Sequence, residues 1–488
     1  MELKWKIQWL GLIAGPVLAS ISYILLPESY LDVSGNSVEF ASAGRVTLSV
    51  LIWMAVWWLT EAIHISATAL LPIVLFPLLG ATTIEAATAP YSHPLVFLVL
   101  GGFLIAIALE KWRLDRRIAY NTLRLVGCYP INMIGGVMMV TAFLRAFVSN
   151  TATAAMMLPI AMSVIELEQA SRDEKQESNF DIAMLLGIAY AASIGGIATI
   201  IGTGPNAFLV GFVSEEYQRE LSFTGWLPIG LSVTLLFLPL TWMILTKILF
   251  PVTNDPIEGG VEMIESGLKE LGPVSRAEKL TLLVFLIAAL LWTFRPLLAG
   301  FPPLKGLTDA GVSMFCALLL FVIPVNIRES RFLLDWEAAA KIPWGILLLF
   351  GGGLSLSSAV QHTGVAEFIG SHAGLLTELP GFMHILLVTF TVTALTELTS
   401  NVATTASFLP ILASLAPALK VDPYSLIVAA TLASSCAFMM PVATPPNAIV
   451  FGSGKLKMAQ MIRAGIWLNL VGVVLVSMIA LFLVPIVF

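Results

Sequence analysis

The chain has 488 residues, of which 58% are hydrophobic and 11% are charged, and its formal net charge is −6 at pH 7. Water-soluble domains carry about 25% charged residues, so the composition excludes a single soluble core and predicts an all-α protein that crosses a lipid membrane many times. No basic run indicates a nucleic acid as a partner. The three cysteines are scattered and match no disulfide framework or metal-ligand spacing.

Apolar stretches long enough to cross the ~30 Å hydrocarbon core recur along the whole chain. The first of them is long for a signal peptide, and no cleavage site clearly follows it, so we expect it to be retained as a helix. We predict about 11 transmembrane helices, at residues 7–26, 45–60, 64–80, 93–110, 182–212, 226–250, 279–297, 308–325, 343–361, 425–453 and 463–487.

Two further apolar segments, near 131–165 and 382–418, are polar in the middle. Each is too polar at its centre for a plain spanning helix and has the length of two short helices joined at a tip. Irregular backbone at membrane depth must line a cavity or be buried in protein. We therefore expect each segment to form a re-entrant hairpin, which enters and leaves the membrane on the same side.

The two predicted hairpins carry the same uncommon motif. Residues Ser149–Thr153 read SNTAT, and residues Ser400–Thr404, 251 positions later, read SNVAT. Each copy has a partner downstream, GTGPN at Gly202–Asn206 and ATPPN at Ala443–Asn447. Polar, helix-breaking residues at matched positions of two hydrophobic halves are typical of a binding site at a repeat interface inside a membrane.

The repeat divides the chain into four parts. We expect an N-terminal helix and outer loop (1–44), a first repeat (45–250), a solvated and partly helical cytoplasmic linker (251–278) and a second repeat (279–488). The predicted spans place an odd number of crossings in each repeat. The two repeats are therefore predicted to be inverted relative to each other.

The positions of Lys and Arg favour one orientation in the membrane. With the N-terminus in the cytoplasm, few of the 25 basic residues fall in outer loops, as the positive-inside rule requires. The C-terminus then lies outside, in what we expect to be a plasma (inner) membrane. The residues assigned to the outer side are Arg45, Arg219, Arg295, Lys305 and Lys420.

The motif residues suit ion binding. Hydroxyls, amide oxygens and freed carbonyls bind a cation such as Na⁺, while freed N–H groups and helix N-termini attract anions. Twin sites indicate a substrate with two anionic ends. A single Ser-Asn-Thr run is also compatible with simple helix capping, but two copies with downstream partners favour a binding site.

Two charged residues inside the predicted hairpins are each compatible with two interpretations. Arg145 precedes Ser149 by one helical turn, so it either faces the motif or extends along the hairpin to cytoplasmic water. Glu397 precedes Ser400 by three positions. It either holds the second hairpin through hydrogen bonds or pairs with a cation.

The chain resembles the divalent anion:sodium symporter family over essentially its whole length. The resemblance is strongest at Ser149–Pro159, Ala191–Asn206 and Thr396–Pro410, and in the phrase PVATPPNAIVFG at Pro441–Gly452. It implies a homodimer whose protomers each have a scaffold domain and a transport domain. The transport domain holds both hairpins and moves across the membrane as an elevator.

The resemblance also implies roles for the motif residues, with Na⁺ as the coupling ion and no organic cofactor. The positions that match the two sodium sites are Ser149, Asn150 and Gly202 for the first site and Thr396, Ser400, Asn401 and Ala443 for the second. The positions that match the substrate site are Asn150, Thr151, Thr203, Asn401, Val402 and Thr444.

Two departures from the family pattern bear on function. Val402 stands where many members have threonine. The animal dicarboxylate transporters resemble this chain at that position, which favours C4 dicarboxylates such as succinate, malate or fumarate over citrate or sulfate. Arg145 stands where a small residue is common, and it is the candidate coupling charge. The expectation is sodium symport, with a sodium-independent dicarboxylate exchanger as the alternative.

Two other classes of protein fit the sequence less well. A membrane-embedded enzyme needs a nucleophile, an acid–base pair or a metal cluster at the midplane, and the sequence shows none. A passive anion channel does not need paired hairpins. A secondary transporter is therefore the preferred reading.

Overall fold

The computed structural model of the chain describes residues 2–31, 36–170, 178–253, 255–372 and 379–488. Arg172 and Lys175, which the orientation argument places in the cytoplasm, lie outside these described ranges. The described residues are almost entirely helical, with two small antiparallel pairs of strands, β1–β2 and β3–β4, in loops. The predicted all-α membrane architecture is confirmed.

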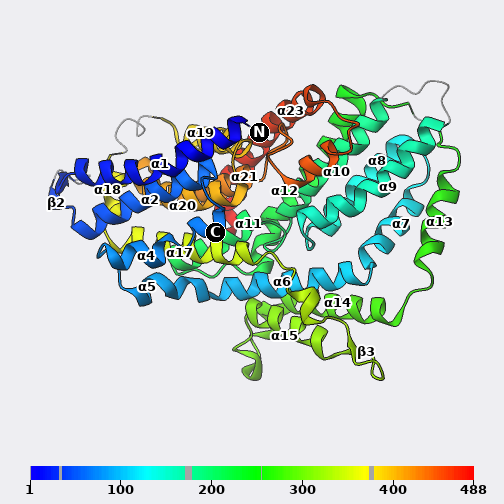
Figure 1. Cartoon of the computed structure of the whole chain (residues 1–488), viewed down its shortest axis with the longest axis horizontal. Helices are drawn as coiled ribbons and strands as arrows, with labels where there is room; N and C mark the ends of the chain where they lie inside the picture. Colours follow the sequence, from blue (N-terminus) through cyan, green and yellow to red (C-terminus); the bar gives the residue numbers. More distant parts are fainter. Residues whose placement is uncertain (1, 32–35, 171–177, 254, 373–378) are drawn as a thin grey trace.

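The first half runs from the N-terminus through the first hairpin to a long twelfth helix (Figure 1). Its elements in chain order are α1 (Glu2–Leu25), β1 (Ser29–Leu31), β2 (Ser37–Glu39), α2 (Ser42–Thr60), α3 (Ile65–Thr68), α4 (Leu71–Leu78), α5 (Ile84–Thr88), η1 (Ala89–Ser92), α6 (Pro94–Lys111), α7 (Leu114–Val126), α8 (Pro130–Arg145), α9 (Asn150–Ala170), α10 (Asn179–Ile197), α11 (Gly204–Tyr217), α12 (Phe223–Met243) and η2 (Ile244–Leu249).

The second half starts with an amphipathic helix in the predicted linker and ends on the 25-residue helix α23 and the short helix α24. Its elements are α13 (Gly260–Leu271), α14 (Arg276–Leu298), η3 (Pro302–Leu304), α15 (Asp309–Val322), β3 (Pro324–Asn326), β4 (Arg331–Phe332), α16 (Trp336–Ala339), α17 (Trp344–His362), α18 (Val365–Ser371), α19 (Gly381–Thr396), α20 (Asn401–Leu419), α21 (Pro423–Ser434), α22 (Pro445–Phe451), α23 (Met458–Phe482) and α24 (Val484–Val487).

The predicted spans coincide with helices, although not all of them are long. Ten helices in the described ranges are long and apolar enough to cross a membrane, and two of these, Asn150–Ala170 and Asn401–Leu419, are second arms of hairpins. The predicted spans 64–80 and 308–325 correspond to the shorter apolar helices Ile65–Leu78 and Asp309–Val322. Packing between protein segments, which hydropathy does not register, accounts for these short helices.

Both predicted hairpins form, and their tips have the same local structure. In each, a 16-residue helix (α8 or α19) is followed by two turn residues, a bend and one extended residue before the second arm (α9 or α20) begins. The second arms begin at Asn150 and Asn401, the asparagines of the two repeated motifs. The repeat seen in the sequence is therefore a repeat of backbone structure.

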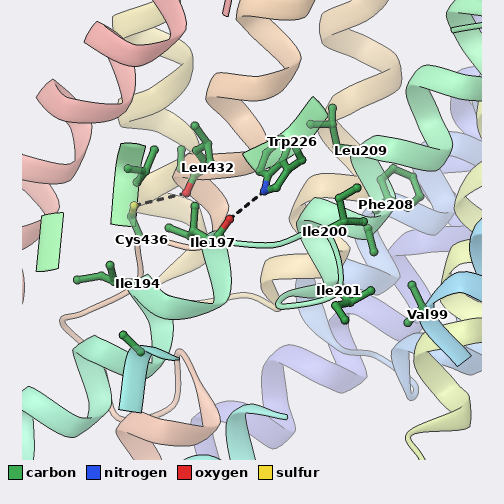
Figure 2. Close-up of a cluster of buried hydrophobic side chains, with 14 of the residues drawn as sticks. Val99, Ile194, Ile197, Ile200, Ile201, Phe208, Leu209, Trp226, Leu432 and Cys436 are labelled. Atoms are coloured by element: carbon green, nitrogen blue, oxygen red, sulfur yellow. Dashed lines mark hydrogen bonds between the residues drawn. The ribbon is translucent and has the colours of Figure 1, made fainter. Parts of the chain in front are cut away.

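The spans predicted at 182–212 and 425–453 are each broken in the middle. The first consists of α10 and α11, and the second consists of α21 and α22. A proline stands in the first turn of α11 and of α22, where its missing N–H costs no hydrogen bond. The break after α10 lies in an apolar cluster that includes Ile194, Ile200 and Phe208 (Figure 2).

Helices α6, α14 and α15 lie along the lower side of the molecule in Figure 1 and pack on one another. Two amphipathic helices, α7 and α13, run side by side at the right edge of the same view and lead towards the first hairpin and into α14. A buried ion pair joins this region to α14, because Arg117 Nε lies 2.6 Å from Glu278 Oε1. Within residues 251–278, helix α13 packs against α7 and α9.

Candidate functional site

A cavity of about 960 Å³ lies where the two hairpin tips meet the two broken helices. Segments more than 300 residues apart in sequence form its wall. It contains every predicted site residue except Thr396. The predicted residues on its wall are Arg145, Ser149, Asn150, Thr151, Gly202, Thr203, Ser400, Asn401, Val402, Ala443 and Thr444.

Three of the longer helices begin at this cavity. The first residues of α9, α11 and α20 are Asn150, Gly204 and Asn401, and all three line the cavity. Helix N-termini carry partial positive charge and unpaired N–H groups. The cavity is therefore suited to an anion, and its two-fold arrangement offers a positive helix end to each end of a dianion.

Arg145 faces the motif, and does not extend to water. Its side chain is buried, with 5% relative exposure, and lines the cavity. Its Nη1 donates to the Val148 carbonyl at 2.9 Å, and its Nε donates to Asn150 Oδ1. The guanidinium thus occupies the concave side of the first hairpin tip.

Gly196 gives the Arg145 side chain its space. A methyl group on Gly196 would lie 3.2 Å from the guanidinium carbon and 3.3 Å from the Gly202 carbonyl oxygen. The positive charge of Arg145 therefore lies close to Asn150 and to Gly202, both predicted to bind the first sodium. None of the salt bridges among the described residues includes Arg145. A buried guanidinium without an acidic partner favours an anion beside it.

The second hairpin tip has an uncharged residue at the position that Arg145 occupies in the first. Thr396 stands 251 positions after Arg145, and its hydroxyl lies 2.8 Å from both Asn401 Oδ1 and the Ser434 carbonyl oxygen. It therefore contacts the motif asparagine in the place where Arg145 does so in the first repeat. Thr396 lies behind Asn401, which explains why it does not reach the cavity wall.

The two motif serines also differ. The Ala152 N–H donates to Ser149 Oγ at 3.2 Å, so Ser149 caps α9. Ser400 is the N-cap of α20 but forms no side-chain cap hydrogen bond. The capping interpretation therefore holds for the first serine, whereas the hydroxyl of the second remains available to a ligand.

The asparagine of each downstream motif braces the broken helix. Asn206 Nδ2 donates to the carbonyls of Gly196, Ile197 and Thr199 at 3.2, 3.0 and 2.9 Å. Asn447 Nδ2 donates to the carbonyls of Ala437 and Met440 at 3.2 and 3.0 Å. Both side chains are fully buried. Backbone freed at membrane depth needs such partners, so these asparagines hold the cavity wall rather than the substrate.

A tryptophan adds to the brace of the first break. Trp226 Nε1 donates to the Ile197 carbonyl at 2.9 Å (Figure 2). This carbonyl belongs to the last residue of α10, where the helix can no longer supply a donor. The break is therefore a stable part of the fold.

Glu397 holds the second break. Its carboxylate accepts hydrogen bonds from the backbone N–H groups of Phe438, Met439 and Met440 at 2.8 to 3.1 Å and from Asn469 Nδ2 at 2.7 Å. It is buried, with 4% relative exposure. The structural interpretation of Glu397 is therefore the one that the geometry supports, since its oxygens are already used by four donors.

Val402 contacts the first repeat across the cavity. A methyl group added to Gly204 would lie 2.4 Å from Val402 Cγ2. The contact joins the start of α11 to the first turn of α20. Glycine at 204 therefore allows the two motifs to approach, and the valine side chain fills the space that results.

Gly204→Ala is expected to weaken substrate affinity about tenfold or more, because overpacking of about 1–3 kcal/mol would push the two motifs apart. The Michaelis constant for uptake of the transported anion is the measurement. Val402→Ala in the same chain removes the clashing methyl group and should restore most of the loss. A double variant as impaired as Gly204→Ala alone would contradict the contact.

Several cavity residues were not among the sequence predictions. Glu61, Phe103, Lys341 and Thr399 also line the cavity. Thr399 lies next to the second motif, and its hydroxyl is 2.7 Å from Thr404 Oγ1, so proximity to the motif was a usable signal. Phe103 comes from α6 and Lys341 from the turn between α16 and α17, and no motif marks them.

A many-helix membrane protein whose cavity is lined by polar motif residues from two hairpin tips and two broken helices is a secondary transporter. The chain belongs to the sodium:sulfate symporter family, because residues 33–488 match the sodium:sulfate symporter transmembrane region. It is a transporter and not an enzyme.

Curated relatives match almost the whole chain. The sodium-dependent dicarboxylate transporter SdcS of Staphylococcus saprophyticus is 39% identical over 484 residues, which cover 98% of this chain and 92% of the relative. The SdcS protein of Staphylococcus aureus is 38% identical over 486 residues, with the same coverage of each chain.

Two solved structures share the fold at low sequence identity. The YdaH transporter of Alcanivorax borkumensis matches with a TM-score of 0.60 and 14% identity, covering 98% of each chain. MtrF of Neisseria gonorrhoeae matches with a TM-score of 0.62 and 12% identity, covering 97% of this chain and 94% of that one.

Proposed function

We propose that the protein is a sodium-dependent transporter of dicarboxylates. The observation that carries this proposal is the convergence of the N-termini of three long helices, α9, α11 and α20, on one cavity between matched hairpin tips. The relatives with 38% and 39% identity bear the name of sodium-dependent dicarboxylate transporters, and the alignments span nearly the full chain. Anion-binding helix ends and oxygen-rich tips are the parts that such a function needs.

The substrate is a C4 dicarboxylate such as succinate, malate or fumarate. Asn150, Thr151 and Thr203 serve one carboxylate, and Asn401 and Thr444 serve the other. Val402 contributes an apolar contact between them, because its side chain has no hydrogen-bonding group. Thr203 is the N-cap of α11 without a side-chain cap bond, so its hydroxyl is available to the substrate.

The second repeat binds a sodium ion through Ser400, Asn401, Thr396 and the Ala443 carbonyl. Oxygen ligands of this kind suit Na⁺, and among the described residues no group of three His, Cys, Asp or Glu side chains forms a metal centre. In the first repeat, Arg145 Nε donates a hydrogen bond to Asn150 Oδ1. Gly196 lies next to both the guanidinium and the Gly202 carbonyl. The fixed guanidinium therefore replaces the sodium of the first site, whose expected ligands are Ser149, Asn150 and Gly202.

Transport proceeds by alternating access. A transport domain that contains both hairpins moves as an elevator against a scaffold domain, and two protomers form a homodimer in the plasma membrane. The support is the matched hairpins and the family resemblance. A sodium-independent dicarboxylate exchanger is the second candidate, because the buried charge of Arg145 is the feature that would replace an ion.

Initial rates of radiolabelled succinate uptake into membrane vesicles test the substrate and the ion together. We expect uptake in NaCl to exceed uptake in choline chloride. Excess malate or fumarate should compete, and equal concentrations of citrate or sulfate should compete less. Strong competition by sulfate, with weak competition by malate, would overturn the dicarboxylate assignment.

A further inference from the structure

A second cavity of about 730 Å³ adjoins the substrate cavity. The two share part of their walls, including Phe103, Ser149, Thr151 and Lys341. The second cavity also has residues from the C-terminal end of α6 and from α16, which the orientation argument places on the cytoplasmic side. It is therefore a vestibule between the first hairpin tip and the cytoplasmic surface.

The charges in this vestibule are not equivalent. Lys111 Nζ lies 2.5 Å from Asp335 Oδ2, and Asp335 Oδ1 accepts the Ala338 N–H at 2.8 Å. The hydrogen bond from Lys111 is the main reason that the pKa of Asp335 lies below its usual value, with a smaller contribution from Lys341. Lys111 and Asp335 therefore largely neutralise each other.

Lys341 differs from these residues in position and in its contacts. It stands in the turn between α16 and α17 and lines both cavities. Its side chain is exposed, and it takes part in none of the side-chain hydrogen bonds or salt bridges described for the chain. The acids Glu110 and Glu337 line the vestibule only. The positive charge of Lys341 thus lies at the junction, with Glu110 and Glu337 on the vestibule side and Glu61 on the wall of the substrate cavity.

We propose that Lys341 is an anion-binding position at the junction of the two cavities, where it pairs with one carboxylate of a dicarboxylate passing between the substrate site and the cytoplasm. This rests on the proposed function. The acids of the vestibule repel a dianion, so a cation at the junction lowers the barrier to entry and exit on this side. The effect is confined to one face of the membrane, because Lys341 lies on one side of the hairpin tips.

The test compares succinate uptake from the two faces, using right-side-out and inside-out vesicles that contain the full-length protein. We expect Lys341→Gln to raise the Michaelis constant at the cytoplasmic face about fivefold, the upper end for an exposed ion pair. The Michaelis constant measured at the outer face should change less than twofold. Lys341→Arg should keep most of the cytoplasmic-face affinity.

Lys279→Gln is the matched control, because Lys279 is an exposed basic residue near the start of α14, on the same predicted side, and lines neither cavity. An equal effect of Lys279→Gln, or an equal effect of Lys341→Gln at both faces, would overturn the proposal. If the wild-type protein fails to transport succinate at all, the proposed function fails. If wild type transports and Lys341→Gln matches it at the cytoplasmic face, only the role of Lys341 fails.

Discussion

Replacing Arg145 with threonine is expected to make transport more dependent on sodium. Threonine is the residue that the second repeat has at the equivalent position, where the uncharged side chain of Thr396 contacts Asn401. The substitution removes the guanidinium from Asn150 Oδ1 and leaves that oxygen available to a cation. A sodium ion then has to supply the charge that the arginine supplied.

The measurement is succinate uptake as a function of sodium concentration. In low sodium, Arg145→Thr should transport at least about tenfold more slowly than wild type, which corresponds to ~1.4 kcal/mol of lost interaction. The Hill coefficient for sodium should rise, since it is limited by the number of coupled sites. Saturating sodium should recover much of the rate.

Arg145→Lys is the control for charge. Lysine keeps the positive charge but lacks the planar fork that holds both Val148 and Asn150. We expect lower activity without a new sodium requirement. A folded Arg145→Thr protein with the sodium dependence of wild type would contradict the assignment of Arg145 to the first sodium site.

Replacing Glu397 with alanine is expected to damage both stability and sodium coupling. The change leaves three backbone N–H groups, those of Phe438, Met439 and Met440, without their acceptor in a buried region. Each unsatisfied group costs about 1–3 kcal/mol. The segment that loses its support leads directly into Ala443, which is on the cavity wall.

Thermal unfolding in detergent and the sodium concentration for half-maximal uptake measure the two effects. Glu397→Ala should unfold at a clearly lower temperature and lose most uptake. Glu397→Gln should be intermediate, because its amide keeps one acceptor oxygen and adds an unwanted donor. Glu265→Ala, an exposed acid on α13, should behave like wild type. Glu397→Ala with normal stability and normal sodium affinity would show that the hydrogen bonds are dispensable.

The sequence predicted the parts of the site that occur twice. The hairpins and their tips were predictable because a polar motif repeats at the same place in two apolar segments. In both segments the folded structure has the predicted turn at the motif. Val402 and Thr203 belong to these repeated motifs, and both line the cavity. Orientation in the membrane and homodimer formation remain predictions, since they concern partners outside the chain.

The remaining contacts depend on tertiary packing. The sequence left two orientations possible for the Arg145 side chain, towards the motif or towards cytoplasmic water. The space beside Gly196 and the hydrogen bond to the Val148 carbonyl favour the first. The sequence left two roles possible for Glu397, holding the hairpin through hydrogen bonds or pairing with a cation. The backbone N–H groups of residues 438–440 donate to its carboxylate, which supports the first role. Lys341 carries no motif and lies nearly 200 positions from the first hairpin, so only the folded chain brings it to the cavity.

Uptake of radiolabelled succinate into proteoliposomes is the most direct test of sodium-coupled dicarboxylate transport. Vesicles are prepared empty or preloaded with succinate, each with and without an inward sodium gradient. We expect accumulation in empty vesicles only when the gradient is present. Uptake that requires internal succinate and ignores sodium would contradict the account and identify an exchanger in which Arg145 replaces the coupling ion.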